Sequence, residues 1–177
     1  MISTIHSCGI AIDMKTTRIL FIFAIIIAIA EGLYFYPLLP DRIAVHFNAV
    51  GTANGWGSKT GFFQMFGVVI VLIAMLFGGF GLVLRLIPDA LINMPNKDYW
   101  LAPEHREETR DRIAGQLLIM GTMTMLLLDG VLFVSLKANL APTAALPAEW
   151  MLGMIIAYVL GNIIWTVKIL RSFRRPH

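Results

Sequence analysis

Cysteine and charge are both scarce in this chain. Cys8 is the only cysteine among 177 residues, and Asp, Glu, Lys and Arg together make up 14% of the sequence. A single thiol excludes an internal disulfide and a zinc site built from cysteines, so packing and hydrogen bonds must hold the loops. A typical soluble domain has a charged fraction of about 25%, so the low charge content favours a membrane protein.

Recognisable catalytic motifs are also missing. The sequence has no HExxH zinc motif, no GxSxG nucleophile elbow and no glycine-rich phosphate loop. Its basic residues are not interleaved with aromatic ones, as nucleic-acid binding would favour. We therefore expect no cofactor, no metal and no nucleic-acid partner, and the sequence leans away from an enzyme.

Long apolar runs dominate what is present. Hydrophobic residues make up 58% of the chain, and the mean hydropathy is +0.75. A membrane-spanning helix needs about 20 predominantly apolar residues. Four runs are long enough, at about residues 18–39, 62–87, 113–136 and 149–170. The sequence predicts an all-α polytopic membrane protein with one four-helix transmembrane domain over residues 18–170, between tails at 1–17 and 171–177.

Lys and Arg are unevenly distributed among the segments that join these runs. Of the 14 Lys and Arg residues, 11 lie in the two tails and the second connection, helix ends included, and 3 lie in the first and third loops. Positive residues accumulate on the cytoplasmic side of a membrane. We expect a multi-pass protein of the bacterial cytoplasmic (inner) membrane, with both termini in the cytoplasm. The first loop, residues 37–59, then faces outward as a structured loop between the first two helices.

The N-terminal region raises two questions of processing. Met14, followed by Lys15, resembles an alternative start, which would make the residues before it dispensable. The sequence Ala28-Ile29-Ala30 after a basic and apolar stretch resembles a signal-peptide cleavage site. Apolar residues nevertheless continue to Leu39, which favours an uncleaved first helix.

Small residues recur every four positions in the first and fourth runs. Such ridges let helix backbones approach closely within lipid. They predict close helix contacts, either inside one chain or in a homo-oligomer. The positions are Ala24, Ala28 and Gly32 in the first run, and Gly153, Ala157 and Gly161 in the fourth.

Two acidic residues, Glu31 and Asp129, lie inside the first and third apolar runs. A charge in mid-membrane costs about 2.5–3.5 kcal/mol, so both should face the bundle interior or a hydrated cavity. We expect the two carboxyls to approach each other and the underside of the first loop. Alternatively, each pairs with a loop cation such as Arg42 or Lys59.

The second connection is polar and carries a motif of its own. Its Asn and Pro residues favour a turn, and its aromatic residues suit a membrane interface. Pro103 is predicted to be the first residue of a helix that runs through residues 104–112, with Glu108 pairing with Arg112, into the third span. We assign this motif no chemistry; its residues are Asn93, Pro95, Lys97, Tyr99, Trp100 and Pro103.

The first loop is the densest polar and aromatic segment of the chain. Ile43, Val45 and Phe47 alternate with other residues, which predicts a short extended segment, and the glycines that follow predict tight turns. Its polar residues either meet a ligand or satisfy the loop's own backbone. The candidate ligand- or partner-binding residues are Arg42, His46, Asn48, Gly51, Trp56 and Lys59.

The first loop resembles the segment that defines domain of unknown function 1648. This bacterial membrane segment also occurs at the N-terminus of SdpI-type proteins, the immunity proteins for the sporulation-delay toxin. SdpI-type members are longer and carry a later cytoplasmic motif that is not found here, so the chain looks like a short uncharacterised member. The second connection also looks like a segment of such short members. The matching loop residues are Pro40, His46, Phe47, Asn48, Gly51, Trp56 and Lys59.

Three functions are compatible with these features. The preferred one is a binding, signalling or immunity-type module whose first loop recognises an envelope peptide or protein. The alternative is a small proton-coupled transporter that uses Glu31, with Asp129 as its partner. The least supported is a metal-dependent membrane enzyme that combines His46 with these two carboxylates.

Overall fold

The computed structural model describes residues 13–174, so Cys8 and nearly all of the segment before Met14 lie outside the described residues. Four helical segments within this range are long and apolar enough to cross a membrane. They cover Met14–Leu38, Lys59–Leu86, Arg106–Leu140 and Ala148–Ser172. The predicted architecture of four spanning helices is therefore confirmed.

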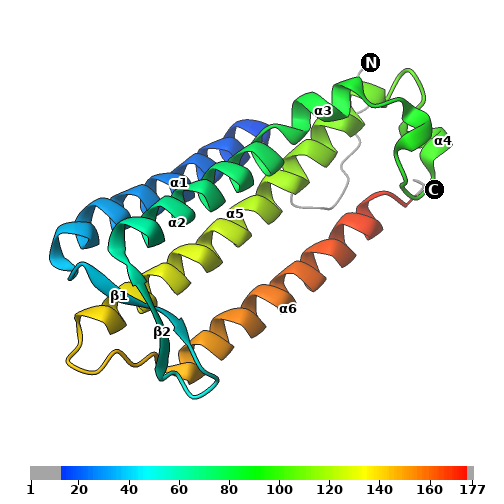
Figure 1. Cartoon of the computed structure of the whole chain (residues 1–177). Helices are drawn as coiled ribbons and strands as arrows, with labels where there is room; N and C mark the ends of the chain where they lie inside the picture. Colours follow the sequence, from blue (N-terminus) through cyan, green and yellow to red (C-terminus); the bar gives the residue numbers. More distant parts are fainter. Residues whose placement is uncertain (1–12, 175–177) are drawn as a thin grey trace.

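The elements follow one another along the chain with short connections (Figure 1). The first and second spans each contain more than one helical element, and a pair of strands joins them. In chain order the elements are α1 Met14–Phe35, the 3₁₀ turn η1 Tyr36–Leu38, β1 Arg42–Phe47, β2 Ala53–Ser58, α2 Lys59–Ile73, the π-helical turn η2 Ala74–Gly78, α3 Phe80–Leu86, the 3₁₀ turn η3 Asp89–Leu91, α4 Lys97–Trp100, α5 Arg106–Leu140 and α6 Ala148–Ser172.

α5 is longer than the apolar run that predicts it. It begins at Arg106 and ends at Leu140, so the charged turns before residue 113 are already helical and Lys137 lies within the helix. Pro103 is not its first residue, because His105 is the N-cap and Pro103 lies in the preceding turn. Hydropathy marks the part of a helix that lies in lipid, whereas the backbone hydrogen bonds continue into the polar flanks.

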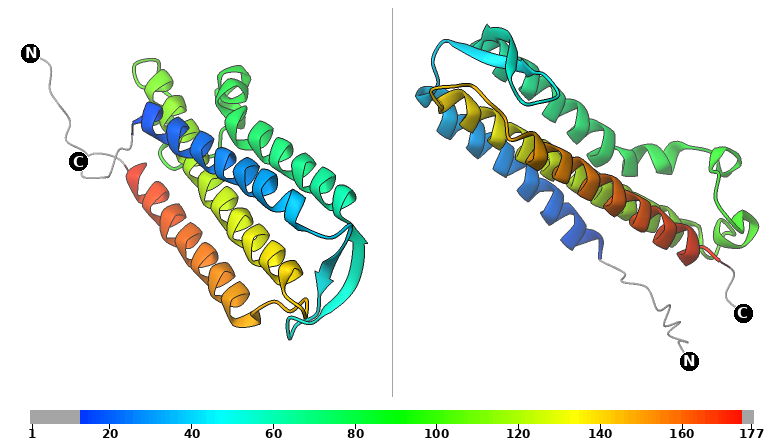
Figure 2. Two further views of the ribbon diagram at one scale, coloured as in Figure 1. Left: turned by 90° about the vertical axis from the view of Figure 1, so that its left-hand side faces the viewer. Right: turned by 90° about the horizontal axis from the view of Figure 1, so that it is seen from below.

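α5 lies at the centre of the bundle. It packs along α1 and also contacts α2, η2, α3 and α6. α6 flanks α5 on the side away from α2, as the two further views show (Figure 2). None of the α6 side chains is fully buried, so most of this helix presents an apolar surface that suits lipid.

The small-residue ridge of α1 lies inside the bundle. Ala24 and Ala28 are each 1% exposed and belong to the same apolar cluster as Leu118 and Met125 of α5. The ridge of α6 packs against the bundle only in part, since an added Cβ at Gly153 would contact nothing within 4 Å. The α1 ridge therefore serves packing within one chain, and a homo-oligomer through α6 stays a prediction.

The bundle has two distinct ends. At one, called the hairpin end, β1 and β2 form an antiparallel two-stranded sheet that lies across the ends of the helices (Figure 1). At the other, called the terminal end, α4 lies beside the end of α6. The extended segment predicted in the first loop is thus confirmed as β1. Its alternation is interrupted by a register shift between Ala44 and His46.

Candidate functional site

The hairpin is anchored in the bundle by its own apolar residues. Ile43 of β1 is fully buried, and Leu39 just before it is 4% exposed. Both join an apolar cluster with Phe35 of α1 and with Leu132 and Leu136 of α5. The strand therefore closes the end of the helix bundle with an apolar layer.

Asn139 near the end of α5 holds the backbone of β1. Its Oδ1 accepts a hydrogen bond from the Ala44 amide at 2.6 Å, and its Nδ2 donates to the Ala44 carbonyl oxygen at 3.0 Å. The Asn139 side chain thus forms the two hydrogen bonds that the backbone of a neighbouring strand would form with Ala44. Because both groups are satisfied, α5 and the hairpin form one connected unit.

The segment between α5 and α6 pairs with the hairpin turn through backbone hydrogen bonds. The Leu146 amide donates to the Gly51 carbonyl oxygen at 2.8 Å, and Thr52 forms an isolated antiparallel bridge with Ala145. Gly51 has a φ of +81°, and an added Cβ would lie 2.0 Å from the Leu146 carbonyl oxygen. Gly51 is therefore required for this close approach of two loops.

Asn48 organises the turn between the strands. Its Oδ1 accepts hydrogen bonds from the amides of Val50 and Thr52, at 3.1 Å and 2.9 Å. Its backbone amide donates to the Thr52 carbonyl oxygen at 2.9 Å. Asn48 thus satisfies the backbone of its own loop.

Lys59 begins α2 and is largely withdrawn from solvent. Its side chain is 13% exposed, and its Nζ donates to the Leu39 carbonyl oxygen at 2.9 Å. The Nζ also lies 3.6 Å from the Asp41 carboxylate and 4.8 Å from the centre of the Tyr36 ring. Lys59 therefore ties α2 to the segment that precedes β1.

Three candidate residues are exposed on the surface of the hairpin. Arg42 and Trp56 are exposed, and together they line a shallow pocket of about 340 Å³. His46 is exposed as well, and its Nδ1 is hydrogen-bonded to Asn54 Oδ1 across the hairpin. Three of the six candidates thus support the loop, and the other three are exposed on its surface.

Glu31 and Asp129 lie at the level of the bundle between the central apolar cluster and the hairpin-end cluster. On α1, Glu31 follows Ala28 of the central cluster and precedes Phe35 of the hairpin-end cluster. On α5, Asp129 lies in the same way between Met125 and Leu132. Glu31 and Asp129 therefore lie at the same level of two helices that pack against each other, and the approach of their carboxyls stays a prediction.

Neither carboxyl group is neutralised by the described part of the chain. Asp129 is 4% exposed, and neither of its carboxylate oxygens has a hydrogen-bond partner among residues 13–174. The Glu31 Oε2 atom is likewise buried without a partner. The alternative pairing with Arg42 or Lys59 is not observed, because Lys59 is engaged elsewhere and the apolar cluster at the hairpin end lies between.

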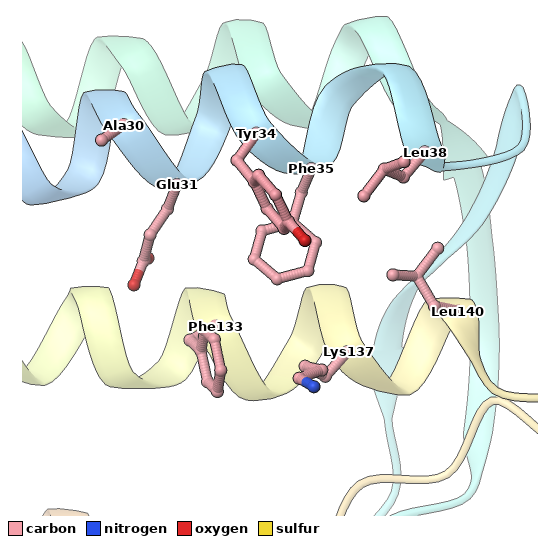
Figure 3. A pocket seen from close by; sticks show the side chains of 8 residues that line it. All are labelled: Ala30, Glu31, Tyr34, Phe35, Leu38, Phe133, Lys137 and Leu140. Atoms are coloured by element: carbon pink, nitrogen blue, oxygen red, sulfur yellow. The ribbon is translucent and has the colours of Figure 1, made fainter.

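A pocket of about 420 Å³ opens beside Glu31 between α1 and α5. Figure 3 shows the Glu31 side chain pointing from α1 towards α5, with Lys137 farther along α5 towards the hairpin. Aromatic and aliphatic side chains form most of the wall. The lining residues are Ala30, Glu31, Tyr34, Phe35, Leu38, Phe133, Lys137 and Leu140.

The motif of the second connection holds the end of α6. Asn96 Nδ2 and Trp100 Nε1 both donate to the Phe173 carbonyl oxygen, at 2.9 Å and 2.8 Å. Arg112 lies over the rings of Trp100 and Phe173 instead of pairing with Glu108. Lys97 donates to the Ala90 carbonyl oxygen, Tyr99 stacks edge-on against Trp100, and Asn93, Pro95 and Pro103 are exposed. The motif is therefore a structural clamp at the terminal end.

A second clamp at this end joins α5 to the segment after α3. Arg110 is 7% exposed, and it donates to the carbonyl oxygens of Leu84 and Ile87 and to the Asp89 carboxylate. Arg106 pairs with the other carboxylate oxygen of Asp89 at 2.9 Å. The hydrogen bond from Arg110 is the main reason that the pKa of Asp89 lies below its ordinary value.

Asn139, Arg110 and Asp89 were not among the residues singled out from the sequence. Each lies just outside an apolar run, where polar residues are expected in any membrane protein. Only a contact with a distant backbone group reveals its role, and no local spacing predicts that contact. Within residues 13–174, no three His, Cys, Asp or Glu side chains are grouped so that they could hold a metal ion.

The fold and the site define an integral membrane protein with four spanning helices and a hairpin seated on one end of the bundle. Residues 21–73, from α1 through the hairpin to the end of α2, match the family described as a domain of unknown function (DUF1648). The chain therefore contains a DUF1648 segment, and the resemblance seen in its first loop is confirmed. No curated protein and no solved structure matches the chain.

Proposed function

We propose that this protein is a binding or signalling module of the bacterial cytoplasmic membrane. In this proposal the hairpin end faces outward, both termini lie in the cytoplasm, and the hairpin recognises an envelope peptide or protein. The observation that carries the proposal is that some hairpin residues support the loop while others stay exposed. Asn48, Gly51 and Lys59 hold the loop, which leaves Arg42 and Trp56 free on a rigid support.

The exposed pair has the chemistry of a recognition surface. Tryptophan and arginine are the residues that most often dominate binding energy at protein interfaces. Trp56 is 50% exposed although it lies in a strand, and Arg42 shares a pocket with it. Because the hairpin is already anchored by Ile43 and by Asn139, little ordering entropy is lost on binding. A peptide with an acidic group and an apolar side chain suits this surface.

The exposed surface of the hairpin is also connected to the membrane domain through α5. Ala44 lies opposite Trp56 in the hairpin, and Asn139 of α5 binds both backbone groups of Ala44. α5 then continues to the Arg110 clamp at the terminal end. A toxin-immunity role is one form of this proposal, in which the partner is a peptide that attacks the membrane.

A photo-crosslinking experiment tests the proposal. Benzoylphenylalanine at position 56, expressed in intact cells, is expected to crosslink to an envelope peptide or protein, whereas the same group at the more exposed Leu91 of the terminal end is not. Adding Arg42→Ala or His46→Ala should reduce the product without lowering the amount of inserted protein. Crosslinking that is absent at position 56, or equal at both positions, contradicts recognition by the hairpin.

The carboxyl pair supports a second candidate, proton-coupled transport. Acidic groups without partners inside spanning helices are typical of proton and ion pathways, and Glu31 Oε2 and both oxygens of Asp129 are buried without a partner within residues 13–174. In proteoliposomes, solute movement driven by a proton gradient should disappear in Glu31→Gln and persist in Glu149→Gln, an exposed acidic residue of α6. Gradient-driven movement that survives Glu31→Gln excludes this function.

A further inference from the structure

We propose that the pocket between α1 and α5 binds a lipophilic cation, whose charged group lies against Glu31, with Asp129 at the same level of α5 adding to the negative charge. This inference deepens the second candidate function by naming its substrate class, but it concerns binding alone. The pocket has a volume of about 420 Å³, enough for the rings or chains of a small amphipathic molecule.

The negative charge of Glu31 selects a positive ligand. Glu31 lines the pocket and points from α1 towards α5 (Figure 3). Asp129 of α5 lies at the same level of the bundle, just beyond the lining residues; it is more than nine-tenths buried, and neither of its carboxylate oxygens has a partner within residues 13–174. A bound cation would pair with the Glu31 carboxylate, which the described part of the chain leaves without a partner.

The walls of the pocket suit the apolar part of such a ligand. Tyr34, Phe35 and Phe133 contribute aromatic rings, and Leu38 and Leu140 contribute aliphatic surface. Aromatic faces also attract cations, particularly where water is excluded. A ligand that reached the pocket from the lipid phase would arrive with most of its hydration already lost.

Lys137 does not occupy the acidic end of the pocket. It lies eight positions beyond Asp129 on α5, a separation of about 12 Å along a helix axis. Its Nζ lies 5.7 Å from the centre of the Phe133 ring, and no salt bridge joins it to either carboxylate in residues 13–174. The pocket therefore carries a partly buried carboxyl group at one end and an exposed lysine at the other.

The test measures binding to the full chain in lipid nanodiscs with two probes of the same shape and opposite charge. Labelled tetraphenylphosphonium should bind saturably, and tetraphenylborate should bind no better than it does to empty nanodiscs. Glu31→Gln and Asp129→Asn should each weaken phosphonium binding by about tenfold or more. Glu149→Gln, which changes an exposed acidic residue, should leave it unchanged.

Two further variants separate this site from other occupants. Ala30→Phe should fill the pocket and weaken binding while both carboxyls remain, and Lys137→Gln should leave binding equal or tighter. Thermal unfolding of each variant confirms that it is folded. Equal binding of the two probes would indicate an apolar groove, and preferential binding of tetraphenylborate that is lost in Lys137→Gln would indicate a site for anionic lipid. The absence of saturable phosphonium binding to folded protein would also overturn the inference.

The two proposals for this region fail in different ways. If phosphonium binds as expected but no gradient-driven movement occurs in proteoliposomes, the transport function fails and the binding site stands. If phosphonium does not bind but another solute moves with the proton gradient, the cation site fails and the transport function stands.

Discussion

Individual residues at the hairpin end are specified by their contacts with distant backbone. Asn139 binds the amide and the carbonyl of Ala44, which lies 95 positions earlier in the chain. Lys59 is withdrawn from solvent by the Leu39 carbonyl oxygen, although a lysine in a loop is usually exposed. Residue type alone therefore does not reveal which polar residues of the hairpin are free to bind a partner.

Replacement of Gly51 by alanine should destabilise the hairpin. The left-handed backbone costs a residue with a Cβ roughly 1–2 kcal/mol, and the Cβ would also meet the Leu146 carbonyl oxygen. Hydrogen exchange should become faster at the amides of the hairpin turn and of Leu146. Gly67→Ala is the matched control, since its Cβ would meet nothing within 4 Å. Unchanged exchange in Gly51→Ala would show that the two loops are not closely packed.

Among the elements, α5 connects the two ends of the molecule. Its polar turns, residues 106–112, contribute Arg106 and Arg110 to the clamp with Asp89, and its last turns contribute Asn139 to the hairpin. α6 is held differently, through Phe173 at its end and through one face of α5. The motif of the second connection therefore positions α6.

The clamp at the terminal end should weaken in acid. The hydrogen bond from Arg110 holds the pKa of Asp89 below its ordinary value of 3.8, so ionised Asp89 stabilises the folded state. That contribution is complete above the ordinary pKa and is lost as the pH falls through the lower, folded-state pKa. The free energy of unfolding of the unmodified protein should therefore decrease below about pH 4.

Asp89→Asn should lower stability near neutral pH, because the charge-assisted hydrogen bond is lost. It should also remove part of the acid-dependent decrease. Asp98→Asn, at an exposed position in α4, serves as the control. Denaturant unfolding in detergent at several pH values measures both effects, and identical pH profiles for the unmodified protein and Asp89→Asn would contradict this account.

On the scale of the whole molecule, the distribution of charge predicts the orientation of the bundle. The hairpin end carries few Lys and Arg residues, whereas the terminal end carries the clamps and most of the basic residues. By the positive-inside bias, the hairpin should face outward. Recognition of an envelope partner depends on this orientation.

Cysteine labelling in intact cells checks the orientation. In a Cys8→Ser background, Val50→Cys in the hairpin turn should react with a membrane-impermeant maleimide. Leu91→Cys at the terminal end should react only after the membrane is permeabilised. The two positions are matched in accessibility, at 76% and 74% exposed. Labelling in the opposite order would place the hairpin in the cytoplasm and would exclude an envelope ligand.

The sequence by itself determined the four spans and the extended segment of the first loop. Both follow from local properties, because a run of apolar residues has no stable place in water and side chains alternate along a strand. The cost of an isolated charge in lipid also predicted that Asp129 would lie inside the bundle, where it is 4% exposed. The match over residues 21–73 agrees with the loop motif from which the family was inferred.

Only the tertiary structure decided what each polar residue does. It assigned Asn48, Gly51 and Lys59 to the support of the hairpin and left Arg42, His46 and Trp56 exposed. It also placed a pocket beside Glu31 and extended α5 beyond its apolar run. The physical reason is that hydrogen-bond partners and cavities depend on residues brought together by folding, whereas sequence patterns report only the preferences of neighbours along the chain.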